Sequence, residues 1–199
     1  MQKLITNFTK SRLFRTPNLN QTLLRNFSVQ TGSQFPSAIV AVLKYSAEEG
    51  YSNEIVDIQE YLENKKVVFI GYPGAYTPSC TNAHLPQFIQ DSDKIKAQGI
   101  DEIIAMSVND PFVLQFFAEA IGAKDKLTLV ADGNGDLTKA LGLEIDLSEV
   151  LLGNCRSVRF TMIVKDNVIK EINNEGGGKF TETSCALRIQ NQLKELKDL

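Results

Sequence analysis

Short apolar runs alternate with helical patterns through the middle of this chain, and this alternation constrains its fold more than any other feature. Residues 67–71, 103–108 and 127–130 are strand-like runs rich in Val, Ile and Leu. Residues 81–98 and 111–121 instead carry apolar side chains at the spacing of an amphipathic helix. Strands that alternate with helices imply an α/β sandwich built around one sheet.

The N-terminal side of this core predicts one hairpin arm and one short helix. Residues 38–43 are apolar enough for an edge strand or hairpin arm, and residues 48–53 are turn-like. Ile55, Ile58 and Leu62 have helical spacing and indicate a short helix that ends near Asn64. Further along, Asp110 and Pro111 are a clean helix start. We expect the following side chains of that helix to face the core: Phe112, Val113, Phe116, Phe117, Ala120 and Ile121.

The C-terminal side predicts a hairpin and a last helix, which makes the sheet mixed. Residues 158–164 alternate, with Val158, Phe160, Met162 and Val164 on one face and Arg159, Thr161 and Ile163 on the other. Asp166 and Asn167 form a tight turn to a strand over 168–172. After a triglycine loop at 176–178, a C-terminal helix is marked by Ala186, Ile189, Leu193 and Leu196.

Composition excludes several classes of protein. Hydrophobic residues make up 43% and charged residues 23% of the chain, which is ordinary for a soluble globular protein. No apolar run approaches the length of a membrane span, so we expect no membrane partner. Three cysteines without a CxxC pair, and one histidine, match neither a disulfide scaffold nor a multi-histidine metal site.

Charge divides the chain into a basic head and an acidic remainder. Residues 1–30 hold Lys3, Lys10, Arg12, Arg15 and Arg25, and the first acid of the chain is Glu48. An acid-free head rich in Ser, Thr, Asn and Leu is typical of a mitochondrial transit peptide. We expect cleavage after Phe27, with residues 28–199 as the matrix domain. A plain N-terminal tail on a cytoplasmic protein is the alternative, and the acidic remainder argues against nucleic-acid binding.

One cysteine stands where the first central strand gives way to a helix. Cys80 ends the stretch 73–80 (PGAYTPSC) that follows the run 67–70. At a helix N-terminus the unpaired N–H groups and the macrodipole favour an anion, and a thiolate is an anion. From position alone, Cys80 is either a reactive thiolate or a small buried cysteine in a loop.

The stretch 73–80 resembles the peroxidatic motif of the peroxiredoxins, with Tyr76 where phenylalanine is common. Residues 107–112 (SVNDPF) resemble the type II branch, which includes the peroxiredoxin-5 group, and the resemblance extends from about Pro36 to the C-terminus. It implies a thioredoxin-like fold in its peroxiredoxin elaboration, with helices flanking a mixed central sheet. It also implies a peroxidase for hydrogen peroxide and small organic hydroperoxides, a homodimer formed around the active-site face, and no metal, haem or flavin cofactor.

The resemblance assigns roles to particular residues. Cys80 would attack the peroxide and become a sulfenic acid, while Thr77 would hydrogen-bond the thiolate or the peroxide oxygen. Residues 156–160 (RSVRF) resemble the arginine motif of the family, in which Arg159 is the catalytic cation. Pro73 would shield Cys80 from bulk water. We assign Arg156 to structure and His84 to structure or the rim of the pocket.

The step that restores Cys80 has more than one candidate. In plant-like type II enzymes the second cysteine precedes the SVND motif, but that position is Ala105 here. Cys185 resembles the C-terminal resolving cysteine of the peroxiredoxin-5 group and would form a disulfide with Cys80, which thioredoxin would then reduce. In the alternative cycle, Cys185 only packs and glutathione or glutaredoxin rescues Cys80. Cys155 is read as a bystander with a minor claim to the resolving role.

Two other functions remain open from the sequence. A thiol–disulfide oxidoreductase on the same fold usually carries CxxC, whereas position 83 is Ala83 here. A redox-sensing protein would use Cys80 oxidation to change a partner contact, with negligible turnover. The peroxidase interpretation requires that Cys80 lies beside Arg159 and that a peroxide can reach its sulfur.

Overall fold

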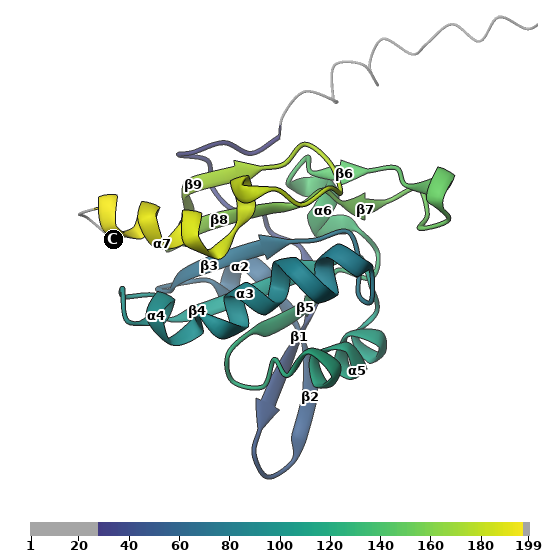
Figure 1. The fold of residues 1–199 in the computed structure, drawn as a ribbon, viewed down its shortest axis with the longest axis horizontal. Coiled ribbons are helices and arrows are strands. Elements are labelled where there is room, and N and C mark those ends of the chain that lie inside the picture. Colours follow the sequence, from purple (N-terminus) through teal and green to yellow (C-terminus); the bar gives the residue numbers. More distant parts are fainter. Residues whose placement is uncertain (1–27, 197–199) are drawn as a thin grey trace, which may run out of the picture.

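The computed structural model describes residues 28–196, so the predicted transit segment and its cleavage point after Phe27 lie outside or at the edge of the described residues. A seven-stranded sheet in the order β2-β1-β5-β4-β3-β8-β9 forms the centre of the fold (Figure 1). Its strands are β1 (Ile39–Ser46), β2 (Gly50–Asp57), β3 (Lys66–Gly71), β4 (Glu102–Ser107), β5 (Thr128–Ala131), β8 (Phe160–Lys165) and β9 (Val168–Asn174).

Helices connect and cover these strands. They are α2 (Ile58–Tyr61), α3 (Leu85–Gln90), α4 (Ser92–Lys96), α5 (Pro111–Ile121), α6 (Asp136–Ala140) and α7 (Ala186–Glu195). Three shorter turns complete them: the π-helix η1 (Cys80–His84) and the 3-10 helices η2 (Ser148–Val150) and η3 (Glu182–Ser184). Within residues 28–196, no helix has the length and apolar character needed to cross a membrane.

The sheet is mixed, as predicted. Strand β4 pairs in parallel with both β3 and β5, whereas β8 pairs antiparallel with β3 and β9, and β1 antiparallel with β2 and β5. A separate two-stranded sheet joins β6 (Glu144–Ile145) to β7 (Arg156–Ser157). The predicted fold class, a mixed sheet flanked by helices, is therefore confirmed.

Each face of the sheet has its own apolar core. One core holds Val68 and Ile70 of β3 with apolar side chains of α3, α4, α5 and α7. The other holds Val67 and Phe69 with side chains of α2, α6 and β8. The predicted alternation around β8 holds, because Val158, Phe160, Met162 and Val164 join the second core and Ile163 joins the first.

The predicted core face of α5 is partly wrong. Phe112 and Phe116 are 69% and 64% exposed, and Val113 and Ala120 are exposed as well. The buried side chains are Leu114, Phe117 and Ala118, with Ile121 packed against the same core. These four positions have the i, i+3, i+4, i+7 spacing of a single helical stripe, so the two outward phenylalanines lie on another face of the helix.

The N-terminal hairpin also differs from expectation. Residues 50–53, predicted as a turn, belong to β2, which pairs with β1 in continuous register from Ile39–Asp57 to Ser46–Gly50. Ile55 is a strand residue with 74% exposure, and the helix starts only at Ile58. Strand β1 lies between β2 and β5, so it is a hairpin arm but not an edge strand. Figure 1 shows this hairpin extending beyond the rest of the sheet.

Candidate active site

Cys80 is the first residue of a widened helical turn that follows β3. The five residues of η1 form a π-helix in which the N–H of Leu85 donates to the carbonyl oxygen of Cys80. Pro86 has no N–H and its ring crowds the preceding turn, so a regular α-helical bond to Asn82 is not available there. The chain instead forms one π turn, in which the hydrogen bond spans five residues and the helix is wider than an α-helix. Cys80 and His84 are thus the two ends of one π turn.

Arg159 meets the sulfur from the residue just before β8. Its Nη2 lies 3.1 Å from the Sγ atom of Cys80, and its side chain is 1% exposed. The Nε and Nη2 atoms also donate to the carbonyl oxygen of Gly178, at 3.3 and 3.0 Å. The backbone is fixed as well, because Arg159 donates to Gly177 and accepts from Glu175. The structure therefore brings Cys80 and Arg159 together, although they are 79 residues apart in the chain.

His84 holds the remaining side of the guanidinium. Its Nδ1 lies 2.8 Å from Nη1 of Arg159, and its Nε2 lies 2.9 Å from the carbonyl oxygen of Ser184. Because guanidinium can only donate, Nδ1 must accept, which leaves the proton on Nε2 to bind the carbonyl. Burial, and secondly the charge of Arg159, lower the pKa of His84 to about 3. His84 is therefore a neutral, fully buried residue of the site itself and not of its rim.

The other predicted residues line the loop between β3 and η1. The Thr77 hydroxyl donates to the carbonyl oxygen of Gly74 at 3.0 Å, which closes the turn before the helix. Pro73 is buried, and a Cβ atom at Gly178 would lie 3.4 Å from its Cγ. Pro73 therefore packs beside the same glycine that accepts from Arg159.

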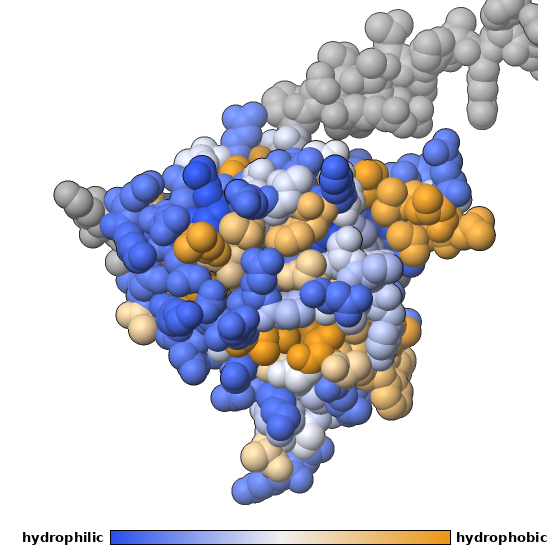
Figure 2. Space-filling model, viewed as in Figure 1, coloured by the Kyte–Doolittle hydropathy of each residue, from blue (hydrophilic) through white to orange (hydrophobic). Residues whose placement is uncertain are grey.

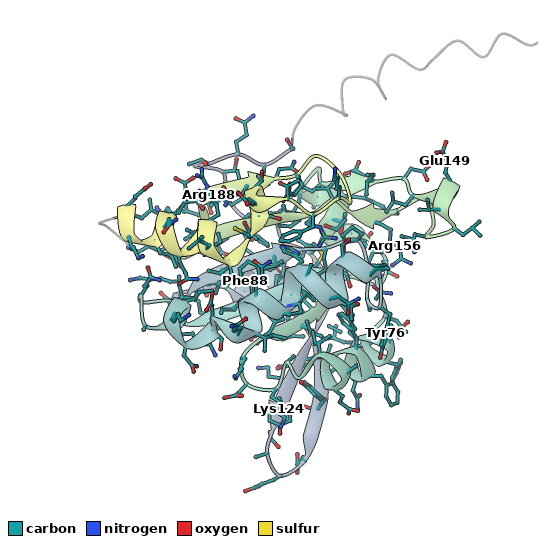
Figure 3. All side chains as sticks on the ribbon, viewed as in Figure 1. Tyr76, Phe88, Lys124, Glu149, Arg156 and Arg188 are labelled. Atoms are coloured by element: carbon teal, nitrogen blue, oxygen red, sulfur yellow. The ribbon has the colours of Figure 1, made fainter. Side chains whose placement is uncertain are left out.

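Two residues support this loop that the sequence interpretation left without a site role. The Oδ1 atom of Asn109 accepts from the backbone N–H of Ala75 at 3.1 Å. Arg156 donates from Nη1 to the Val108 carbonyl and from Nε to the Leu152 carbonyl, at 2.8 and 2.6 Å. Figure 3 shows Arg156 on the same side of the molecule as Tyr76. The contacts of Arg156 are all to backbone oxygen, which fits the structural role predicted for it.

All three cysteines are free thiols. Cys185 is half-buried at the start of α7, where its Sγ accepts from the N–H of Arg188 at 3.4 Å. It lines an open cavity of about 740 Å³ together with Phe180 and Arg188. Burial raises the pKa of the Cys155 thiol, which lies against Gly135. Cys80 and Cys185 thus have different neighbours and are not bonded to each other.

The Cys80 sulfur is enclosed in this structure, although the peroxidase interpretation requires that a peroxide can reach it. The residue has 0% exposed surface and belongs to the core that covers the α3 side of the sheet. A peroxide can therefore reach the sulfur only after neighbouring side chains move.

Comparison with known proteins places this geometry in a family. Residues 30–186 match the family model described as Redoxin. The chain is 41% identical over 171 residues to "Peroxiredoxin-2F, mitochondrial" of Oryza sativa subsp. japonica, which covers 83% of this chain and 86% of the relative. It is similar to reduced Prx3 of Vibrio vulnificus, solved in complex with hydrogen peroxide, at a TM-score of 0.73 and 37% identity, covering 83% and 99% of the two chains. Peroxiredoxin 5 of Alvinella pompejana superposes at a TM-score of 0.70 with 27% identity, covering 84% and 99%.

Proposed function

Because this chain belongs to the peroxiredoxins and is a thiol peroxidase, we propose that Cys80 is the sulfur that peroxide oxidises. The observation that carries the proposal is the 3.1 Å contact between Cys80 Sγ and Arg159 Nη2. The thiolate attacks one peroxide oxygen, so that an S–O bond forms and the O–O bond breaks. The leaving oxygen takes a proton and departs as water or alcohol, and Cys80 becomes a sulfenic acid.

The proposed role of Arg159 is to stabilise charge on both sides of this reaction. A fixed guanidinium beside the sulfur stabilises the thiolate, and its fork of N–H groups can also bind the peroxide oxygens. Thr77 is proposed to turn its hydroxyl to the peroxide when the substrate is present, since it lies one turn before Cys80. Pro73, packed on Gly178, is proposed to keep bulk water from the sulfur.

We propose that Cys185 resolves the sulfenic acid. Its thiol would displace the Cys80 hydroxyl as water and form an intramolecular disulfide, which a thioredoxin-like dithiol then reduces. Two observations support this role. Cys185 is half-buried beside an open cavity, and the residue before it, Ser184, is hydrogen-bonded through its carbonyl oxygen to His84. The alternative is a cycle with Cys80 alone, in which glutathione or glutaredoxin supplies the second thiol.

Mapping of cysteine linkages after treatment with one equivalent of peroxide tests both assignments. We expect a Cys80–Cys185 disulfide by mass spectrometry in the unaltered chain, and a stable Cys80 sulfenic acid in Cys185→Ser. Cys80→Ser should consume no peroxide, and Cys155→Ser is the matched control that should behave as the unaltered chain. Turnover in Cys80→Ser would refute the nucleophile, and a disulfide lost only in Cys155→Ser would move the resolving role to Cys155.

The exposed apolar surface near the site supports a homodimer. Phe112 and Phe116 are exposed on α5, the helix whose Phe117 packs on Tyr76 of the Cys80 loop, and Tyr76 itself is 53% exposed. A second patch lies in the β6–β7 connection, where Val150 and Leu151 are 63% and 92% exposed. Figure 2 shows apolar surface at this connection and along α5. We propose that a second copy of the chain covers this side of the molecule.

A mitochondrial location is proposed from the relatives and the basic head together. Two relatives at 41% identity are named as mitochondrial, and residues 1–27 have the composition of a transit peptide. Import into isolated mitochondria should shorten the chain so that it begins at Ser28. A chain that stays outside at full length would favour the cytoplasm.

A further inference from the structure

We propose that His84 is a positioning residue that holds Arg159 against the Cys80 sulfur and connects this site to the segment that carries Cys185. The inference rests on the proposed roles of Cys80, Arg159 and Cys185. In the hydrogen bonds of residues 28–196, His84 binds neither the sulfur nor a residue that lines the cavity beside Cys185, so we assign its effect to its bonds with Arg159 and Ser184. Its ring also packs against Phe180, which lines that cavity.

The first step of the argument is that His84 fixes the direction of the guanidinium. Arg159 has three groups of partners: the Cys80 sulfur, the Gly178 carbonyl and His84 Nδ1. The sulfur and the carbonyl share Nη2, whereas Nη1 binds the imidazole. Without an acceptor at Nδ1, the buried Nη1 group would lose its hydrogen bond and the guanidinium would be free to turn away from the sulfur.

The second step concerns the other ring nitrogen. Nε2 binds the Ser184 carbonyl, and both residues have 0% exposure. The backbone N–H and hydroxyl of Ser184 in turn donate to the carboxylate of Glu175, at 3.0 and 2.8 Å. The backbone N–H of Glu175 donates to the carbonyl of Arg159 at 2.9 Å. These bonds close a ring that runs through Arg159, His84, Ser184 and Glu175, next to Cys185.

The third step is that the two halves of the cycle need different states of this ring. Cys80 and His84 are the first and last residues of the same π turn. Attack on peroxide requires Arg159 at the sulfur, and therefore the part of the ring in which His84 Nδ1 binds Arg159 Nη1. A disulfide between Cys80 and Cys185 requires the π turn to unwind, which withdraws His84 from both Arg159 and Ser184. Loss of the His84 bond then leaves Ser184, the residue that precedes Cys185, held by its bonds to Glu175 with one contact fewer.

Two substitutions separate the contacts of His84. His84→Asn keeps a side-chain oxygen near the Nδ1 position, which can accept from Arg159, but is too short to reach Ser184. His84→Gln can extend an amide N–H to the Ser184 carbonyl but has no acceptor at the Nδ1 position. Both substitutions are neutral, so neither adds a charge beside Arg159 or Glu175. Urea unfolding of each variant establishes that the rate measurements are made on folded protein.

The experiment measures two rates by stopped flow: sulfenic acid formation in a Cys185→Ser background and disulfide formation with Cys185 present. In His84→Gln we expect the first step to slow by about tenfold, the effect of losing one hydrogen bond to a charged group, while the second step is not slowed. In His84→Asn we expect the first step to change by less than about threefold and the second to accelerate. Equal effects of Asn and Gln on both steps would overturn the proposal.

Two further variants keep the outcomes distinct. Glu175→Gln weakens the Ser184 contacts from the other side and should accelerate disulfide formation with the peroxide step unchanged; an unchanged second step would refute the connection to the Cys185 segment. If Arg159→Lys leaves the peroxide step unaltered, the proposed role of Arg159 itself fails. If Arg159→Lys slows that step but His84→Gln does not, only the inference about His84 fails.

Discussion

At the scale of single residues, the site is organised by one buried cation. Arg159 is 1% exposed, and its side-chain partners are a carbonyl oxygen, a neutral imidazole and the Cys80 sulfur. A buried charge without a counter-charge is costly. Of these three partners, only the sulfur can become an anion by losing a proton. The contact with Cys80 Sγ is therefore the place where the proposed thiolate would supply a counter-charge to Arg159.

Arg159→Lys tests whether the geometry of the fork matters as well as its charge. An ammonium group retains the positive charge but cannot reach the sulfur, Gly178 and His84 together from one planar group. We expect the second-order rate with hydrogen peroxide to fall by at least about tenfold, as for the loss of one charged hydrogen bond. Arg156→Lys, at an arginine that contacts backbone carbonyls, is the matched control. An unchanged rate in Arg159→Lys would remove its fork from the mechanism.

The sequence predicts a role in the site for Cys80 and Arg159 but not for His84. The reason is the number of residues that separate His84 from its contact partners in the chain. Cys80 and Arg159 could be proposed because each lies in a recognisable local motif. For His84 the sequence indicates a structural role or a place at the rim of the pocket. Its partners Arg159 and Ser184 are 75 and 100 residues away in the chain, and no local sequence pattern predicts these contacts. The spacing of four residues from Cys80 was the available signal, and it pointed to a shared helical face. Only the fold shows that this face meets Arg159 and Ser184.

At the scale of elements, the strand before the site depends on a close approach. Gly71 of β3 lies opposite Phe160 of β8, and the phenylalanine ring occupies the space where a side chain would be. A Cβ atom at Gly71 would lie 2.0 Å from Cε1 of that ring. The ring also stacks on Phe69, with centroids 6.5 Å apart. Glycine at the last position of β3, just before the Cys80 loop, therefore leaves room for the Phe160 ring.

Gly71→Ala should destabilise the protein because the Phe160 ring must move within a packed core. Overpacking of this kind costs about 1–3 kcal/mol, and we expect a lower urea midpoint. Gly133→Ala is the matched control, since a Cβ atom there would meet its nearest neighbours at 3.8 Å. Equal midpoints for the two variants would show that the ring can be displaced without cost.

Element prediction failed where the sequence pattern has two readings. In α5 the phenylalanines at 112, 116 and 117 all suggested a core face, but only Phe117 is buried. Periodicity alone does not decide which apolar stripe of a helix meets its own sheet and which is left for another surface. Residues 50–53, part of the predicted turn 48–53, are held in strand β2 by backbone pairing with β1. The regular β3, β4 and β5 runs carried no such ambiguity.

At the scale of the whole molecule, the second stripe of α5 leads to a test of the proposed dimer. Replacing Phe112 and Phe116 together by Ser removes large exposed apolar side chains without touching the core, so the fold should persist. We expect sedimentation velocity to shift from dimer to monomer at micromolar concentration. Leu187→Ser is the control, because Leu187 is 63% exposed on α7, away from this patch. A monomer before substitution, or a dimer after it, would contradict the proposed interface.

The pH dependence of unfolding should report the single histidine of the chain. Burial, and secondly the charge of Arg159, lower the pKa of His84 from 6.5 to about 3. Between these two pH values the imidazole is protonated in the unfolded chain and neutral in the folded chain. The sign follows from linkage: this contribution is complete above pH 6.5 and is lost as the pH falls toward about 3.

The expected loss is on the order of 1 kcal/mol per pH unit below the unfolded pKa. Urea unfolding between about pH 5 and pH 7 measures it above the range in which most carboxylates titrate. Asp132, whose pKa is raised by burial, contributes a slope of the opposite sign to the pH dependence of stability, but this contribution is the same in the unaltered chain and in His84→Gln. His84→Gln should therefore lack the slope that His84 contributes, so that its pH profile is flatter than that of the unaltered chain even if the variant is less stable throughout. Parallel pH profiles for the two proteins would mean that the imidazole takes up its proton without leaving the folded site, and that its contact with Arg159 is weaker than the geometry indicates.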